Sequence, residues 1–188
     1  MVSSTSIHPH QDLIAACKGG DRKAQFRLYQ LYSRAMLNIC VRMLRDQAAA
    51  EDALQEAFVS AFRKLHTFEG RASFGAWLKR IVVNRCLSYL SRNQPYTESL
   101  DESHFREPDA DVGEDVDLPL SPTQIHEAIK TLPDGCRVIF NLYLLEGYDH
   151  QEIADILGVS VSTSKSQYHR ARMLLRERLQ AQLVHEEN

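Results

Sequence analysis

Basic, amide and hydroxyl side chains gather near the C-terminus of this 188-residue chain. Between residues 162 and 172 the candidate hydrogen-bond donors and cations for nucleic acid are Lys165, Ser166, Gln167, His169, Arg170 and Arg172. Arg, Lys and Gln donate hydrogen bonds to base edges in the major groove of DNA, and further positive charge attracts the phosphates. These residue types on one predicted helix therefore indicate binding of nucleic acid.

The segment before these residues has the local signals of two short helices around a tight turn. Asp149 and Glu152 have the spacing of a capping box, so a helix can begin there. Gly158 ends that helix because glycine enters the left-handed conformation without steric cost, and Ser160 or Ser162 can cap the next helix. This order predicts a helix-turn-helix, whose second helix enters the major groove. The alternative is a helical hairpin with a solvated basic face, which this ordered set of signals disfavours.

Several side chains of this motif have an expected place in its packing or in its contacts with DNA. Ser164 lies where the second helix of such a motif usually buries an aliphatic residue, so we expect Tyr168, four residues later, to supply the packing. His150 and His169 fall on polar helix faces, where we expect them to be solvated. On the second helix, Gln167 has the chemistry to pair with adenine through two hydrogen bonds.

The composition is that of a globular protein, with 44% hydrophobic and 25% charged residues. The N-terminus lacks the pattern of a signal peptide, and no apolar run approaches the roughly 20 residues that span a bilayer. We therefore expect a cytoplasmic protein with no membrane insertion. The four cysteines are scattered, which favours buried free thiols over disulfides or a zinc site. No P-loop, G-x-G-x-x-G, H-E-x-x-H or nucleophile elbow is present, so we expect no catalytic residues, metal or cofactor.

Charge is distributed unevenly along the chain. Residues 12–92 contain 14 Lys/Arg and 7 Asp/Glu, a net charge of +7, whereas residues 93–121 contain 1 Arg and 9 Asp/Glu, a net charge of −8. The acidic stretch has Pro, Gly and Ser throughout and no helical period, which is typical of a flexible linker. We therefore predict an all-α protein with two small helical domains, residues 11–92 and 122–182, joined by an acidic linker at 93–121.

Apolar residues at helical spacing predict four helices in the first domain. The first covers about 12–18, the second follows Asp21, the third ends near His66, and the fourth follows Ser73. The second domain begins at Ser121, a cap followed by a first-turn proline. The apolar positions that we expect to face inward include Leu31, Ile125 and Leu145.

Two polar faces of the first domain are candidates for binding. Asp52, Gln55 and Glu56 have the i, i+3 and i+4 spacing of one face of the third helix. On the fourth helix, a basic polar flank contains Lys79, Arg80, Asn84 and Arg85. Either face has an ordinary interpretation as solvated surface.

Four segments in order resemble the extracytoplasmic-function sigma factors of the sigma-70 family: AEDALQEAF at 50–58, FEGRASFGAWLKRIVVNRCLSYL at 68–90, IKTLPDGCRVIFNLYLLEGYDHQEIADILG at 129–158, and STSKSQYHRAR at 162–172. The resemblance implies a protein without catalytic activity that binds core RNA polymerase, directs it to a two-part promoter and helps open the duplex. It also implies an anti-sigma factor as a partner, since many members of the family are held inactive by one.

The resemblance further implies roles for the polar faces. Asp52, Gln55 and Glu56 match the segment that binds the largest polymerase subunit. The loop at 66–73 and the helix after it match the minus-ten module, in which Phe68, Arg71 and Phe74 are candidates for a base pocket. Asn84 matches an Asn that often marks this helix, and Lys79, Arg80 and Arg85 are candidates for phosphate contacts. The basic helix at 162–172 matches the part that recognises the minus-thirty-five element, with Arg172 expected at phosphates.

Two other interpretations remain open from the sequence. A self-standing helix-turn-helix regulator would explain the second domain and predicts a dimer on a two-fold site, but it explains neither Asn84 nor the acidic face at Asp52. For the linker, the alternatives are a passive tether and an acidic mimic of nucleic acid; we favour a tether with weak mimicry.

Overall fold

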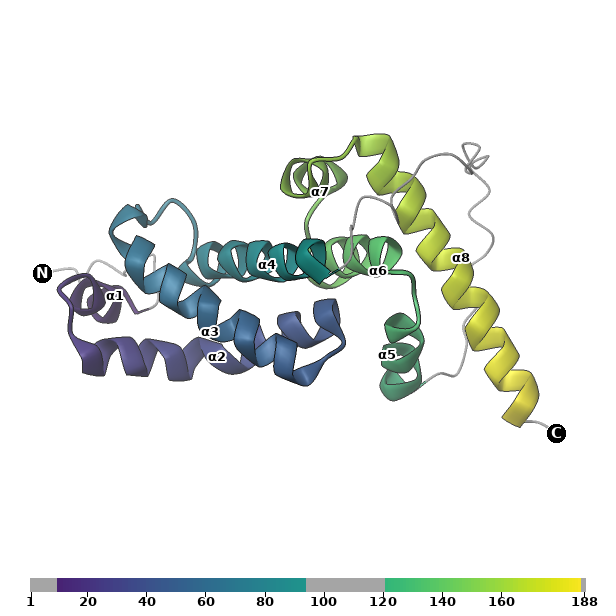
Figure 1. The fold of residues 1–188 in the computed structure, drawn as a ribbon, viewed down its shortest axis with the longest axis horizontal. Helices are drawn as coiled ribbons and strands as arrows, with labels where there is room; N and C mark the ends of the chain where they lie inside the picture. The colour runs from purple at the N-terminus through teal and green to yellow at the C-terminus, as the bar shows by residue number, and fades with distance from the viewer. Residues whose placement is uncertain (1–9, 94–120, 187–188) are drawn as a thin grey trace, which may run out of the picture. The chain divides into compact units, whose positions relative to one another are not determined.

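A computed structural model describes residues 10–93 and 121–186, and the predicted acidic linker lies almost entirely outside the described residues. The chain divides into two compact units, residues 1–90 (unit 1) and residues 91–188 (unit 2). Within the described ranges every regular element is a helix, as the sequence predicted (Figure 1). None of the helices in those ranges has the length and apolar character needed to cross a membrane.

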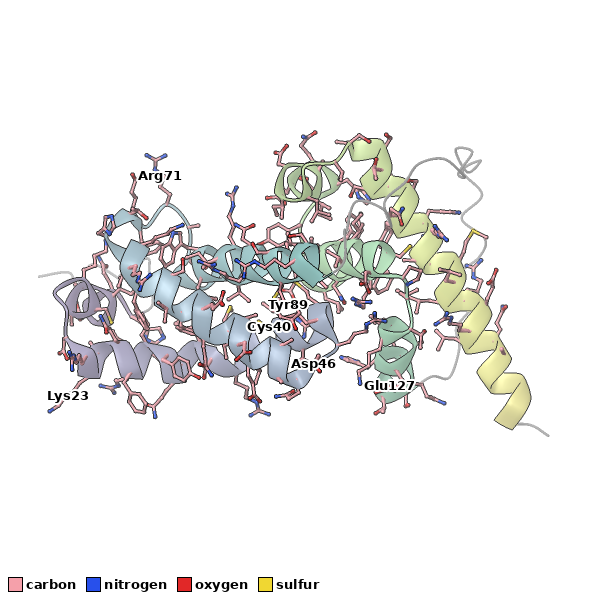
Figure 2. The ribbon with its side chains drawn as sticks, in the orientation of Figure 1. Lys23, Cys40, Asp46, Arg71, Tyr89 and Glu127 are labelled. Atoms are coloured by element: carbon pink, nitrogen blue, oxygen red, sulfur yellow. The ribbon has the colours of Figure 1, made fainter. Side chains whose placement is uncertain are left out.

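Unit 1 is built around a long helical hairpin, α2 and α3, which lie side by side in Figure 1. Its helices are α1 (Gln11–Lys18), α2 (Arg22–Leu44), α3 (Gln47–Lys64), the short 3₁₀ helix η1 (Leu65–Thr67) and α4 (Phe74–Asn93). Asp21 caps α2 by accepting from the Lys23 amide at 2.8 Å, and Asp46, labelled in Figure 2, caps α3 by accepting from the Ala49 amide at 2.7 Å. The hairpin therefore begins each long helix at a carboxylate that satisfies free backbone amides.

Small residues on α3 let the helices of unit 1 pack closely. The buried face of α3 contains Ala49, Ala50, Ala53, Ala57 and Ala61, and the other core residues of unit 1 include Leu28, Cys40, Leu78 and Val82. The cysteines of the chain are free and buried, as expected. The prediction that Leu31 faces inward is wrong, because half of its surface (50%) is exposed on α2.

Unit 2 contains α5 (Pro122–Lys130), α6 (Asp134–Phe140), a π-helical turn η3 (Asn141–Leu145), α7 (His150–Leu157) and α8 (Val161–Glu186). Ser121 and Gln124 form a capping box at the start of α5. The core includes Leu132, Cys136, Ala171 and Leu175. Ile125 and Leu145, both predicted to face inward, are 38% and 42% exposed. The π-helical turn adds a residue to the helical register, which moves Leu145 away from the face that the sequence spacing assigned to it.

A buried ion pair, which the sequence did not predict, stands at the start of α6. The Arg137 side chain is 1% exposed, and its Nη1 atom lies 2.6 Å from the Asp134 carboxylate. The same nitrogen donates to the Leu132 carbonyl at 3.1 Å. The guanidinium charge is thus held inside unit 2 by a carboxylate and a backbone acceptor.

Candidate nucleic-acid interface

The helix-turn-helix forms from α7, the turn and α8 as the local signals predict. The Asp149 carboxylate accepts from the Glu152 amide at 2.8 Å, and Glu152 accepts from the Asp149 amide at 2.9 Å. Gly158 ends α7 with φ 68° and ψ 34°, the left-handed conformation. Of the two candidate caps for α8, Ser160 accepts from the Thr163 amide at 3.0 Å.

One face of α8 leaves its polar and basic side chains accessible. Lys165 is exposed, and Ser166, His169, Arg170 and Arg172 are partly exposed. Because Lys165, Ser166, His169 and Arg172 follow at intervals of one, three and three residues, they share one side of the helix. The Ser166 hydroxyl donates to the Thr163 carbonyl at 3.1 Å and keeps its oxygen as an acceptor. This side thus combines hydrogen-bonding groups in the first turns with cations further along, an arrangement that suits DNA recognition.

Gln167 is not part of this accessible face, contrary to the prediction that it contacts DNA. The side chain is only 5% exposed, and the Cys136 thiol of α6 donates a hydrogen bond to its Oε1 atom at 3.0 Å. The reason is helical phase, since Gln167 lies three residues after Ser164 and four before Ala171, which are both fully buried. The spacing of Gln167 from Ser164 and Ala171 could be read from the sequence. The prediction followed the polar side chain of Gln167 instead of this spacing.

A histidine and two tyrosines fill the space between α7, the π-helical turn and α8. The rings of Tyr143 and His150 stack with centroids 4.4 Å apart, and Tyr168 packs against Tyr143 at 4.5 Å and Phe140 at 5.8 Å. Tyr168 therefore supplies the packing expected of it. Ser164 is fully buried.

His150 is half-buried, so the expectation that it is solvated is wrong. Its Nδ1 atom shares a hydrogen bond with Ser164 Oγ at 2.9 Å. Burial lowers the pKa of His150, and nearby Lys165 lowers it further, while Asp149 opposes both. The neutral imidazole is thus the form that fits between α7 and α8.

In unit 1, the exposed stripe of α4 contains part of the predicted basic flank. Arg80 and Asn84 are exposed, and Lys79 and Arg85 are partly exposed on either side of them. Arg71 projects from the loop between η1 and α4 (Figure 2) and pairs with Glu69 at 2.7 Å. The loop and helix therefore present cations and an amide, which are suitable for a nucleic-acid strand.

Phe68 and Phe74 do not form an open base pocket, contrary to the sequence-based expectation. Both are buried, with 7% and 3% of their surfaces exposed. Their rings lie 5.7 Å apart, and each also packs against Trp77, at 5.4 Å and 5.6 Å. Phe68, Phe74 and Trp77 thus form an aromatic cluster in which only Trp77 is partly exposed.

The polar face of α3 is exposed and adjoins the basic flank of α4. Asp52, Gln55 and Glu56 are all exposed, and Glu56 lies 3.6 Å from Arg85 Nη1. Both residues line an open groove of about 530 Å³ that also includes Arg63 and Lys64. Those two cations were not among the predicted site residues, although their place at the end of α3 beside the loop was visible in the sequence.

The geometry of unit 2 defines a helix-turn-helix DNA-binding protein, and comparison with known proteins defines its family. A model described as Sigma-70 region 2 matches residues 28–96, and one described as Sigma-70, region 4 matches residues 123–175. The RNA polymerase sigma-H factor of Pseudomonas aeruginosa is 30% identical over 181 residues, which cover 90% of this chain and 93% of that protein. The ECF RNA polymerase sigma factor SigW of Bacillus subtilis is 32% identical, with 88% and 94% covered.

Solved structures of two proteins share the fold. The sigma factor RpoE of Bartonella quintana, solved in complex with the anti-sigma factor NepR, matches with a TM-score of 0.56 at 23% identity, covering 82% of this chain and 95% of that one. CnrH, solved in complex with the cytosolic domain of CnrY, matches with a TM-score of 0.55 at 23% identity, covering 90% and 96%. The chain belongs to the ECF RNA polymerase sigma factors of the sigma-70 family.

Proposed function

We propose that this sigma factor divides promoter recognition between its two units. Unit 1 binds core RNA polymerase and the minus-ten element, and unit 2 binds the minus-thirty-five element. The observation that supports this division is the helix-turn-helix of α7 and α8, whose accessible side has donors at its start and cations beyond them. The matches of Sigma-70 region 2 and region 4 to the two parts of the chain agree with it.

In unit 2, we assign base contacts to the first turns of α8. In this assignment Lys165, Ser166 and His169 contact base edges, and Arg170 and Arg172 supply charge for the bases or the flanking phosphates. Gln167 is omitted from this set because it is buried. The consensus sequence should therefore lack an adenine specified by a bidentate glutamine contact.

In unit 1, we assign Asp52, Gln55 and Glu56 to the polymerase and the α4 side to the melted strand. Arg80 and Asn84 are the exposed centre of that side, with Lys79, Arg85 and Arg71 around them. A single strand is bound through cations along its backbone and contacts to its unpaired bases. The exposed carboxylates of α3 suit a basic partner surface.

The protein acts without catalysis of its own and works in the cytoplasm, where core polymerase and promoter DNA are found. An anti-sigma factor is a further proposed partner, because two structures of the same fold were solved with such a protein or with a cytosolic partner domain.

The direct test is transcription by core RNA polymerase with the purified protein on a library of promoter fragments. We expect initiation at fragments that share two separated sequence elements, and none without the protein. If no complex with the polymerase forms and the protein alone binds a two-fold duplex site as a dimer, it is a self-standing regulator and the roles given to Asp52 and Asn84 are wrong.

A further inference from the structure

The buried side of α8 changes character along the helix. Its later turns bury Ala171, Leu175 and Leu179, which are apolar. Its first turns, those nearest the expected base contacts, bury Thr163, Ser164 and Gln167, which are 5%, 0% and 5% exposed. The Thr163 hydroxyl bonds locally with the Ser160 hydroxyl of the turn at 2.7 Å. Burying a polar group costs free energy unless it has a hydrogen-bond partner, so the partners of Ser164 and Gln167 matter for the stability of this helix.

Ser164 and Gln167 each connect α8 to a different helix of unit 2. Ser164 Oγ shares its hydrogen bond with His150 Nδ1 of α7 at 2.9 Å. Gln167 Oε1 accepts from the Cys136 thiol of α6 at 3.0 Å. Ser164 and Gln167 are three residues apart and so lie on the same side of α8. The first turns of this helix are therefore held at two points by contacts that depend on direction.

Directional contacts fix the rotation of a helix about its own axis more tightly than apolar packing does. The hydrophobic effect is non-directional, whereas a hydrogen bond weakens steeply when its atoms lose alignment. Rotation matters for α8 because one residue corresponds to about 100° around the helix. A modest turn would move Lys165 and His169 away from the base edges that they face.

We propose that Ser164 and Gln167 are positioning residues that set the sequence specificity of α8 without contacting DNA. The proposal rests on the proposed function of unit 2 and adds the origin of its specificity. Gln167 acts through the orientation of Lys165, Ser166 and His169, and Ser164 acts through His150 on the angle between α7 and α8. Phosphate contacts further along the helix carry no base sequence, so a change in them would alter affinity more than specificity.

The thiol donor offers a matched pair of variants. Cys136→Ala removes the donor to Gln167, and Cys136→Ser keeps a donor at nearly the same place. Each full-length variant is combined with core RNA polymerase, and transcription is measured from a library in which only the upstream element varies. The specificity ratio is initiation from the best upstream element divided by initiation from its single-base variants. Thermal unfolding is followed in parallel.

We expect Cys136→Ala to lower the specificity ratio about tenfold, the discrimination that one base contact provides at the lower end of its range. Cys136→Ser should keep the wild-type ratio, and Ser164→Ala should lower the ratio as Cys136→Ala does. Gln167→Met, which keeps the length of the side chain and removes its amide, is measured beside them and takes the place of Cys136→Ala if that variant does not fold.

Two results would overturn the proposal. An unchanged ratio in Cys136→Ala and in Ser164→Ala would show that these contacts serve stability alone. An equally sharp preference for a different base in Gln167→Met would show that Gln167 turns outward and contacts DNA itself. If the wild-type protein directs no initiation at all, the proposed function has failed, and that result is distinct from either of these.

Discussion

At the scale of single residues, burial decides which charged pairs matter for stability. Asp134 with Arg137 and Glu127 with Lys130 are both i, i+3 pairs at 2.6 Å. The Arg137 side chain is 1% exposed, whereas both side chains of the Glu127 pair are about half exposed. Removing one partner of a buried pair leaves a charge without compensation, and removing one of an exposed pair leaves it to water.

We therefore expect Asp134→Ala to destabilise unit 2 by about 3 kcal/mol and Glu127→Ala by less than about 1 kcal/mol. Urea denaturation followed by circular dichroism would measure both. Trp77, the single tryptophan of the chain, belongs to unit 1, so its fluorescence transition serves as an internal reference that should not move. Equal costs for the two substitutions would contradict the importance given to burial.

His150 makes the stability of unit 2 depend on pH. Its pKa in the folded protein is lowered from 6.5, chiefly by burial, so the unfolded chain binds a proton more readily than the folded one. The contribution of His150 to stability is therefore complete above pH 6.5 and is lost as the pH falls towards the lowered folded value. His150→Gln should flatten the decline of unit 2 stability below pH 6.5, measured by thermal unfolding across a pH series.

The exposed His126 of the same unit provides the control for this measurement. His126→Gln should leave the decline as it is in the wild type. An equal flattening in both variants would mean that loss of any histidine has this effect, and that the contacts of His150 with Ser164 and Tyr143 are not its cause.

At the scale of elements, the turn of the helix-turn-helix depends on one backbone conformation. Gly158 has a φ of 68°, and a Cβ placed there would meet nothing within 4 Å. A side chain at position 158 would therefore destabilise the fold through its backbone conformation, and not through a clash with neighbouring atoms. We expect Gly158→Ala to destabilise unit 2 by about 1–2 kcal/mol and Gly158→Asn to cost less, because Asn tolerates the left-handed region. Thermal unfolding would rank them, and an equal cost would point to something other than backbone conformation.

The sequence predicted the elements well because their signals are local. Asp21, Ser121 and Asp149 were each predicted to cap a helix, through hydrogen bonds within a single turn. The structure has a helix beginning at each of them. Predictions failed where a contact from another helix decides the outcome. Gln167 faces inward because α6 provides the Cys136 thiol, and His150 is half-buried because Tyr143 and Ser164 meet it from two other elements.

The candidate surfaces could likewise be predicted only in part from the sequence. Their composition was visible in the sequence, because i, i+3 and i+4 spacing places Asp52, Gln55 and Glu56 on one face, and all three are exposed. Their adjacency was not visible, because the approach of Glu56 to Arg85 depends on how α3 packs against α4. Helical phase alone also could not show that Phe68 and Phe74 are covered, since Trp77 packs against both.

At the scale of the whole molecule, the two units should contribute independently to the electrostatics of promoter binding. Arg80 of unit 1 is exposed and Arg172 of unit 2 is partly exposed, and the two are assigned to phosphates in different parts of the promoter. A protein that neutralises phosphates releases counterions, so its affinity falls with salt. The magnitude of the logarithmic slope is about 0.7 per contact on a single strand and about 0.9 on duplex DNA.

We expect Arg80→Ala and Arg172→Ala each to reduce the salt slope of promoter binding by the complex with core polymerase, by about 0.7 and 0.9 respectively if each cation meets one phosphate. The double variant should show the sum of the two losses, because distant sites without shared partners behave additively. Arg34→Ala removes an exposed cation of α2 that lies outside the candidate surfaces on α3, α4 and α8. This variant should leave the slope unchanged. An equal loss in Arg34→Ala would mean that net charge, and not placement, governs binding. A smaller loss in the double variant than the sum would mean that the units do not engage the promoter independently.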